Sequence, residues 1–272
     1  MTHRQAAWAA ILLFLFADGC TVGTRVQPMR ATASVEPTDS LALESSVVDF
    51  CFDGEELVLL EASGERLIAL DPDFAYSETI PLTERLVAPK GIAADRFYFY
   101  VYDDRGLFRM TKEQLVLRSW LGNVRVTGLA SFSTGEMLVS DADHDAVWYK
   151  TVFGESRKFL GLPDVKKPGP ILALRDGRFC VLSGGNELVW FNRAGIVDKR
   201  MNLGQTYDRL CADTTDRLFL ALSTEPVVRV VSVKEQAVVE LSGVSGIVAM
   251  RARGDEVVVL DGKGKLYFYR MP

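Results

Sequence analysis

The sequence predicts an all-β chain folded as a six-bladed β-propeller with four-stranded blades, on the basis of three observations. Pairs of short apolar runs recur six times, and the first run of each pair begins at Leu57, Phe97, Met137, Phe179, Leu218 and Val257. The steps between these positions are 39 to 42 residues, which matches the period of about 40 residues of propeller blades. Turn residues such as Gly, Asp and Ser separate the runs. The 272 residues, 48% of them hydrophobic, are enough for six such units in one domain.

The third unit shows the expected strands of a blade most clearly. Residues 128–132, 137–140, 147–150 and 157–160 form short apolar or mixed runs, and polar turns with Gly or Asp lie between them. Runs of this length are usual for strands. We therefore expect four strands in every blade.

The sixth unit contains only three such runs, the last ending near Tyr269, whereas a spare run at 38–43 precedes the first unit. We expect this N-terminal segment to supply the fourth strand of the last blade, because that closure removes an open sheet edge and joins the ends of the ring. The expected division of the chain is a signal peptide at 1–19, a tether at 20–37 and the propeller at 38–272.

The N-terminal segment resembles the signal of a bacterial lipoprotein. Arg4 precedes an apolar run at 6–17, which is short for a membrane span but suits a secretory signal. Small residues then lead to Cys20, with Gly19 before it. The resemblance implies acylation of Cys20 and a membrane-anchored protein of the bacterial cell envelope, facing the periplasm or the exterior. A secreted protein cleaved nearby and an uncleaved anchor are the alternatives.

The net charge argues against one class of partner, and the number of cysteines predicts the state of the thiols. The net charge is -5 and no run of Lys or Arg occurs, so we expect no nucleic-acid partner. Besides Cys20, the chain contains Cys51, Cys180 and Cys211, an odd number that cannot all pair internally. We expect these three to be free, buried thiols.

Several units resemble the NHL-type repeat of six-bladed propellers. Pro89-Lys90-Gly91-Ile92-Ala93 opens the second unit with the Pro-x-Gly-Ile-Ala pattern of that repeat, and the segments 135–148 and 177–191 show its turn, strand, polar turn and second strand. Units one and five lack the Pro-x-Gly opening. The resemblance extends over about 46–271 and implies propeller architecture. Related propellers include zinc or calcium enzymes, such as amidating lyases and lactonases, as well as scaffolds.

Few residues suit catalysis. Beyond the signal, His144 is the sole histidine, whereas a zinc site needs three or four N or S ligands and the lyases of the resembling group need several histidines. His144 lies in a polar turn that we expect to be remote from the channel mouth. We therefore do not expect a Ser-His-Asp triad.

Asp141, Asp143 and Asp145 in the same turn resemble the start of a calcium loop, because alternating oxygen ligands converge on a hard cation. Ala146 stands where such a loop needs Gly, and 150–152 contains no acid where its final Glu would be. Asp is also a good turn former. We interpret the three as turn residues and expect no cofactor, with a weak calcium site at this turn as the alternative.

The first strands of the blades should converge at one end of the central channel, where their opening residues are candidate ligand contacts. Aligning the units places Lys90, Thr127, Asp208 and Arg209 at this mouth. Lys90, Asp208 and Arg209 suit an anionic or polar ligand. The alternative is that Asp208 and Arg209 pair only with their neighbours.

Tyr98, Tyr100 and Tyr102 alternate along one expected strand and therefore share a face. Such a row can stack on sugars or contact a partner. We expect these tyrosines instead to pack between adjacent blades.

Together these observations favour a lipid-anchored, extracytoplasmic propeller that serves as a non-catalytic binding or scaffold module for an envelope protein or a small ligand. Membership of a larger envelope complex is a variant of the same interpretation. The alternative is a calcium-dependent propeller hydrolase or lactonase with its site in the central channel. Such an enzyme needs several channel acids, and the first strands offer mainly Asp49, Asp208 and Asp213, the last expected in a turn.

Overall fold

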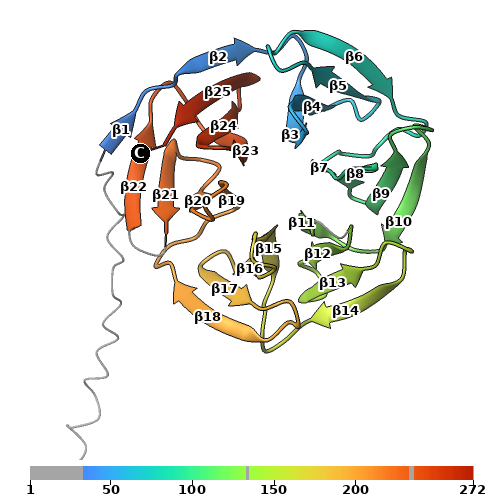
Figure 1. The fold of residues 1–272 in the computed structure, drawn as a ribbon, viewed down its shortest axis with the longest axis vertical. Coiled ribbons are helices and arrows are strands. Elements are labelled where there is room, and N and C mark those ends of the chain that lie inside the picture. Colours follow the sequence, from blue (N-terminus) through green and yellow to red (C-terminus); the bar gives the residue numbers. More distant parts are fainter. Residues whose placement is uncertain (1–32, 133–134, 233–235, 272) are drawn as a thin grey trace, which may run out of the picture.

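A computed structural model describes residues 33–132, 135–232 and 236–271. The described residues form strands and turns without a helix, and so contain no helix able to cross a membrane. Six sheets form a closed ring, with the first strand of each blade facing the centre (Figure 1). The predicted six-bladed, four-stranded propeller is confirmed.

The strands run antiparallel from the centre outward within each blade. The first three blades contain β3 (Val47–Asp53), β4 (Glu56–Glu61), β5 (Arg66–Leu70) and β6 (Tyr76–Pro81); β7 (Gly91–Ala94), β8 (Tyr98–Asp103), β9 (Gly106–Thr111) and β10 (Leu117–Gly122); and β11 (Val126–Ser131), β12 (Met137–Asp141), β13 (Ala146–Lys150) and β14 (Ser156–Leu160). The last three contain β15 (Pro168–Ala173), β16 (Phe179–Ser183), β17 (Glu187–Phe191) and β18 (Val197–Asn202); β19 (Arg209–Ala212), β20 (Leu218–Ala221), β21 (Val227–Val231) and β22 (Gln236–Leu241); and β23 (Ile247–Arg253), β24 (Glu256–Asp261), β25 (Lys265–Arg270) and β2 (Asp39–Ala42).

The N-terminal strand β2 closes the last blade, as predicted. It pairs antiparallel with β25, and Leu41 lies opposite Leu266. Leu41 and Leu43 also pack against the apolar cluster between blades one and six. Chain ends that are far apart in sequence are thereby joined in one sheet, which covers the edge that β25 would otherwise expose.

The tether differs from the prediction at its C-terminal end. Residues 33–35, which the sequence analysis assigned to the tether, form β1 (Ala33–Val35), and β1 adds a fifth, parallel strand outside β22. Its three residues are exposed or half-buried, so backbone pairing forms this strand without an apolar pattern that sequence could reveal. The predicted signal peptide, the tether up to residue 32 and Cys20 lie outside the described residues.

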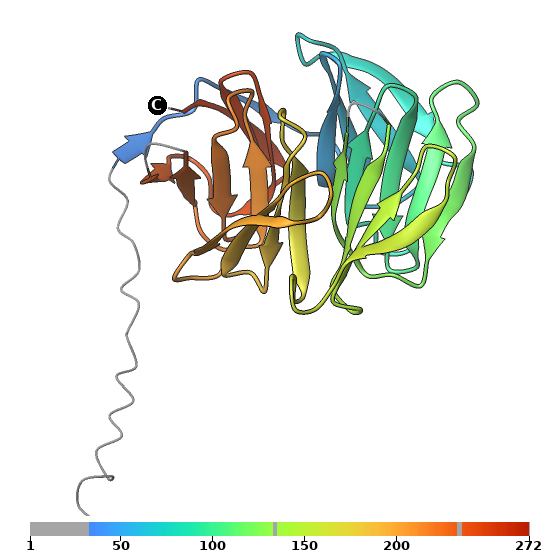
Figure 2. The ribbon, with the colours of Figure 1, turned by 60° about the horizontal axis from the view of Figure 1, so that its bottom comes forward.

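The ring has two faces with different turns (Figure 2). We call the end at which each inner strand begins the mouth face; it carries the connections between blades and the turns between the second and third strands. The opposite end, the base face, carries the turns between the first and second strands and between the third and fourth strands.

The core consists of six apolar clusters, one at each interface between neighbouring blades. The cluster between blades two and three contains Tyr100, which is 1% exposed, and Tyr98 and Tyr102 pack against it. The expectation that this tyrosine row packs between blades is confirmed. Gly91 permits part of this packing, because a Cβ there would lie 2.3 Å from the Tyr102 ring.

The three cysteines of the propeller are free and buried, as predicted. Burial raises the pKa of the Cys180 and Cys211 thiols to about 12. These thiols are therefore protonated at neutral pH and act as small apolar side chains.

Candidate functional site at the mouth of the channel

The inner strands enclose a central cavity of about 380 Å³. Its lining comes from β3, β7, β11, β15, β19 and β23, so every blade contributes. The inner strands contribute small and apolar residues with a few polar groups, which is the usual make-up of a ligand pocket.

The structure brings all four predicted mouth residues to the wall of this cavity: Lys90, Thr127, Asp208 and Arg209. Lys90 forms an ion pair with Asp104, and the Thr127 hydroxyl donates to the Pro168 carbonyl oxygen at 2.5 Å. Their convergence is thus observed, whereas their role as ligand contacts stays a prediction.

Asp208 and Arg209 have the local partners that the alternative interpretation named. The Asp208 carboxylate accepts hydrogen bonds from the Ser223 amide at 2.8 Å and the Ser223 hydroxyl at 2.6 Å. Arg209 lies 3.6 Å from Asp208 and donates through Nε to the Val248 carbonyl oxygen at 2.7 Å. About a third of each side chain or more remains exposed, so both are held in place and still face solvent.

An ion pair in the channel wall between the buried Asp49 and the half-buried Arg251 was not predicted. Arg251 of β23 donates through Nη2 to both carboxylate oxygens of Asp49 on β3, at 2.8 and 2.7 Å. Asp49 also accepts the amide hydrogen of Ile92 on β7 at 3.0 Å. One carboxylate therefore joins blades six, one and two. Sequence reasoning noted Asp49 inside an apolar strand but had no signal for Arg251, because 202 residues separate the partners.

The electrostatics of this pair follow from its depth. Burial raises the pKa of Asp49 above its ordinary value, and the Arg251 charge and the Ile92 amide oppose that rise. For Arg251, burial acts to lower the pKa, but Asp49, Tyr102, Cys51 and Cys211 together outweigh it and the pKa lies above its ordinary value. Burial next to Asp49 also raises the pKa of the Tyr102 phenol. Arg251 is therefore a permanent cation in the channel, and about a third of its side chain is exposed there.

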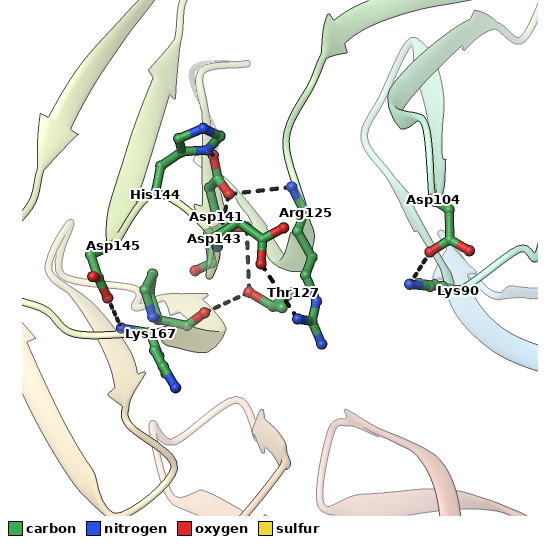
Figure 3. A network of polar contacts seen from close by, with 11 residues as sticks. Lys90, Asp104, Arg125, Thr127, Asp141, Asp143, His144, Asp145 and Lys167 are labelled. Atoms are coloured by element: carbon green, nitrogen blue, oxygen red, sulfur yellow. Dashed lines mark hydrogen bonds and ion pairs between the residues drawn. The ribbon is translucent and has the colours of Figure 1, made fainter.

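A second hollow of about 630 Å³ adjoins the channel on the mouth face. It lies between blades two and three, and its polar lining includes Asp104, Arg105, Arg125 and Asp143. Lys90 lines both this hollow and the central cavity. The two hollows thus adjoin and carry exposed charges of both signs. Figure 3 shows the ion pair of Lys90 with Asp104 and that of Arg125 with Asp143.

The turn with His144 lies beside this surface, and the expectation that it is remote from the mouth is wrong. Asp143 of the turn lines the same hollow as Lys90, and it forms an ion pair with Arg125 at 3.4 Å (Figure 3). The reason is topological, since the second strand returns to the end at which the first strand began. Among the described residues, the polar partner of His144 is Asp141, at 2.7 Å.

The three aspartates of this turn have separate partners. Asp141 is buried and accepts from the Arg125 and Asp143 amides at 3.2 Å and from Trp148 Nε1 at 3.0 Å. Asp145 accepts from the Lys167 amide at 2.5 Å. In the described part of the chain, no group of three or more His, Cys, Asp or Glu residues is arranged to hold a metal ion. The geometry favours the turn interpretation.

Asp141 belongs to a repeated structural device. The residue that ends the second strand accepts a hydrogen bond from the amide of the preceding connection in three successive blades: Asp103 from Val87 at 2.7 Å, Asp141 from Arg125 at 3.2 Å and Ser183 from Lys166 at 3.0 Å. These bonds fix the connections that form the rim of the mouth. Sequence reasoning had the signal, an Asp at the end of an apolar strand, but did not assign it this role.

Comparisons with known proteins identify the fold. No family model and no curated protein sequence matches this chain, so the NHL-type repeat stays a resemblance. The virginiamycin B lyase from Staphylococcus aureus has 10% sequence identity and a TM-score of 0.63, with 86% of this chain and 88% of that chain covered.

Two further similar structures come from complexes. One is in a nidogen/laminin complex, with 15% identity, a TM-score of 0.60 and coverage of 71% of this chain and 80% of that chain. The other is in the structure described as YCF48 bound to D1 peptide, with 15% identity, a TM-score of 0.60 and coverage of 85% and 82%. At these identities the likeness shows the six-bladed propeller fold alone. Propellers of this shape include a lyase and proteins in protein complexes.

Proposed function

We propose that this protein is a lipid-anchored, extracytoplasmic propeller that binds a polar segment of an envelope protein at its mouth face without catalysing a reaction. The observation that carries this proposal is the continuous polar surface formed by the central cavity and the adjoining hollow, which share Lys90. Two adjoining hollows that carry exposed charges of both signs suit a peptide segment with several polar side chains.

The electrostatic design of the mouth supports binding through polar contacts. Lys90, Arg125 and Asp143 are held by ion pairs on the rim yet remain substantially exposed. Arg251 adds a half-buried cation inside the channel. Such prearranged charges select a partner and its orientation more than they raise raw affinity. The propellers in the nidogen/laminin complex and in YCF48 with the D1 peptide support a protein partner by analogy of fold.

The calcium-dependent hydrolase or lactonase is the second candidate, and the channel acids give it little support. Asp49 is bound by Arg251, and Asp208 by Ser223. Asp213 lies in the turn after β19, where it accepts from Arg217 Nε at 2.6 Å. Each carboxylate therefore has protein partners of its own, and the described residues contain no group of three or more His, Cys, Asp or Glu arranged to hold a metal ion.

The test is a pull-down of the intact protein from detergent-solubilised envelope, with matched charge reversals. Lys90→Glu and Arg125→Glu each break one exposed ion pair on the mouth face, and Arg178→Glu breaks a comparable exposed pair with Asp176 on the base face. We expect each mouth variant to weaken capture of a stoichiometric partner about tenfold, and the base variant to leave it unchanged.

A thermal-shift series with calcium completes this test. We expect no stabilisation by millimolar calcium, because the described acids do not converge. A clear calcium-dependent rise in the melting temperature, together with equal capture by wild type and mouth variants, would contradict the proposed binding function. It would favour the calcium-dependent hydrolase or lactonase instead.

A further inference from the structure

Exposed apolar side chains gather on the base face. Of the large apolar residues exposed in the described part of the chain, two lie on the mouth face, Val87 and Leu162. Six lie at the base face, and five of these belong to blades two to four: Phe97, Val116, Val152, Phe153 and Ile196. We call these five residues the apolar arc. An apolar surface concentrated on one face marks an interaction site more reliably than scattered exposure does.

The turns that carry the arc are fixed by hydrogen bonds. Phe153, which is 94% exposed, lies in a turn where the buried Lys150 donates through Nζ to the Gly154 carbonyl oxygen at 2.7 Å. The Asn192 side chain accepts from the amide of Ile196 at 3.0 Å, and Asp95 accepts from the amide of Phe97 at 2.8 Å. These apolar side chains are therefore presented to solvent by ordered turns.

Basic residues flank the arc. The turn and outer-strand segments 112–120, 151–160 and 192–200 contain seven Lys or Arg and three Asp or Glu, in a chain whose net charge is -5. Arg118, Arg157 and Lys199 are exposed at the start of the outer strands, next to the arc. We call these three residues the basic flank. The corresponding segment of blade one, 71–80, has three acids and no base, so the combination is confined to blades two to four.

The direction of β1 relates the N-terminus of the described chain to the same side. β1 runs parallel to β22, with Ala33 beside Val239 and Val35 beside Leu241. β22 runs from the base face to the mouth face, so the N-terminal end of β1 points toward the base face. Cys20, the proposed lipid attachment site, lies thirteen positions before Ala33, which fully extended is a reach of about 45 Å.

We propose that the base face of blades two to four docks on an anionic membrane surface, with the apolar arc in the headgroup region and the basic flank on lipid phosphates. Burial of apolar side chains and attraction to anionic lipids together drive such interfacial binding, and a single lipid chain holds a protein firmly only with a second signal of this kind. This inference extends the proposed function, on which its anchoring argument rests, because docking would point the mouth face away from the membrane toward a partner.

The experiment uses the chain from Thr21 onward, which contains all described strands, so that no lipid or signal segment contributes. Co-sedimentation is measured with vesicles of phosphatidylcholine alone and with 30% phosphatidylglycerol (about one lipid in three). We expect binding to the anionic vesicles that weakens with salt. Val152→Ser with Phe153→Ser should reduce it about tenfold or more, and Arg118→Gln with Arg157→Gln also about tenfold.

Matched controls lie on the opposite face. Val87→Ser with Leu162→Ser, and Lys166→Gln with Lys167→Gln, remove the same chemistry from exposed mouth-face positions and should leave vesicle binding unchanged. Circular dichroism melting checks that each variant is folded.

Three results would overturn the docking proposal. The first is equal sedimentation with both vesicle types. The second is a loss of binding in the mouth-face controls as large as in the base-face variants. The third is a wild-type dimer that Val152→Ser with Phe153→Ser converts to a monomer, because the apolar arc would then bind a second copy of the chain. Absence of acylation at Cys20 by mass spectrometry would refute the anchor while vesicle binding stands. If Cys20 is acylated but the chain from Thr21 onward does not bind anionic vesicles, the docking proposal is refuted and the anchor stands.

Discussion

Asp103 and Asp141 occupy the same position in successive blades, and both are buried acids that bind backbone amides of the mouth rim. The role explains why an acid follows an apolar strand in this repeat. A buried carboxylate is costly unless its hydrogen bonds are satisfied, and here the satisfied bonds fix loops that would otherwise move. These hydrogen bonds attach the rim of the candidate site to the second strands of the blades.

Two substitutions in one turn distinguish the buried structural acid Asp141 from the exposed Asp143. Asp141→Ala leaves several donors without an acceptor and should lower the free energy of unfolding by roughly 3 kcal/mol. Asp143→Ala removes one exposed contact of 3.4 Å with Arg125 and should cost about 0.5 kcal/mol at most. Urea denaturation measures both. Equal, small effects would contradict the assignment of Asp141 as a structural acid.

Glu61 ends the second strand of blade one, as Asp103 and Asp141 do in the next two blades, and its contribution to stability should depend on pH. Its hydrogen bonds with Arg66 hold the pKa of Glu61 at about 2, below its ordinary value. Because the pKa in the folded state is lowered, the stabilisation is present above about pH 4.5 and is lost as the pH falls toward 2. Glu61→Gln should therefore lower stability by about 1 kcal/mol at pH 7, since Arg66 is partly exposed and screened.

Measuring wild type and Glu61→Gln at low pH provides the control for this prediction. At pH 2 to 2.5 the wild type has lost most of this contribution, so the difference in melting temperature between wild type and Glu61→Gln should shrink toward zero. A difference that stays constant from pH 7 to pH 2.5 would show that the Glu61–Arg66 contact acts without its charge.

At the scale of elements, the two N-terminal strands differ in what they contribute. β2 pairs with β25 and brings Leu41 and Leu43 against the cluster between blades one and six. β1 adds three exposed or half-buried residues outside β22. The first closes the ring, whereas the second only extends a complete blade.

Nested truncations test this difference. A chain beginning at Thr38 loses β1 and should lose about 1 kcal/mol or less. A chain beginning at Glu44 also loses β2, and should lose roughly 3 kcal/mol or more through two leucines and an uncovered strand edge. Thermal unfolding of the two chains compares them. Equal melting temperatures would mean that the ring does not depend on closure by β2.

These elements also show what sequence can predict. The hairpin spacing and the spare run at 38–43 predicted the blades and their closure, because both depend on apolar patterns along the chain. β1 was missed, since exposed residues held by backbone pairing leave no such pattern. The mouth residues Lys90 and Thr127 were placed correctly by aligning repeats. The Asp49–Arg251 pair was not, because ring closure alone brings residues of the first and last blades together.

For the whole molecule, the two faces of the ring have opposite chemistry. The mouth face carries the connected polar hollows, and the base face of blades two to four carries exposed apolar residues flanked by bases. Because the N-terminal end of β1 points toward the base face, an anchored molecule would present its mouth to the surroundings. In the orientation that we propose, one ring would contact a membrane with its base face and a partner with its mouth face.

Site-specific photo-crosslinking of the full chain in cells tests this division of faces most directly. A photoreactive residue replaces Lys90 or Arg125 on the mouth face, or Arg178 or Asp255 on the base face, all of them exposed in ion pairs. We predict that both mouth positions yield an adduct with the same partner protein and that neither base position does. Protein adducts from the base positions alone would contradict the assignment of the mouth as the binding face.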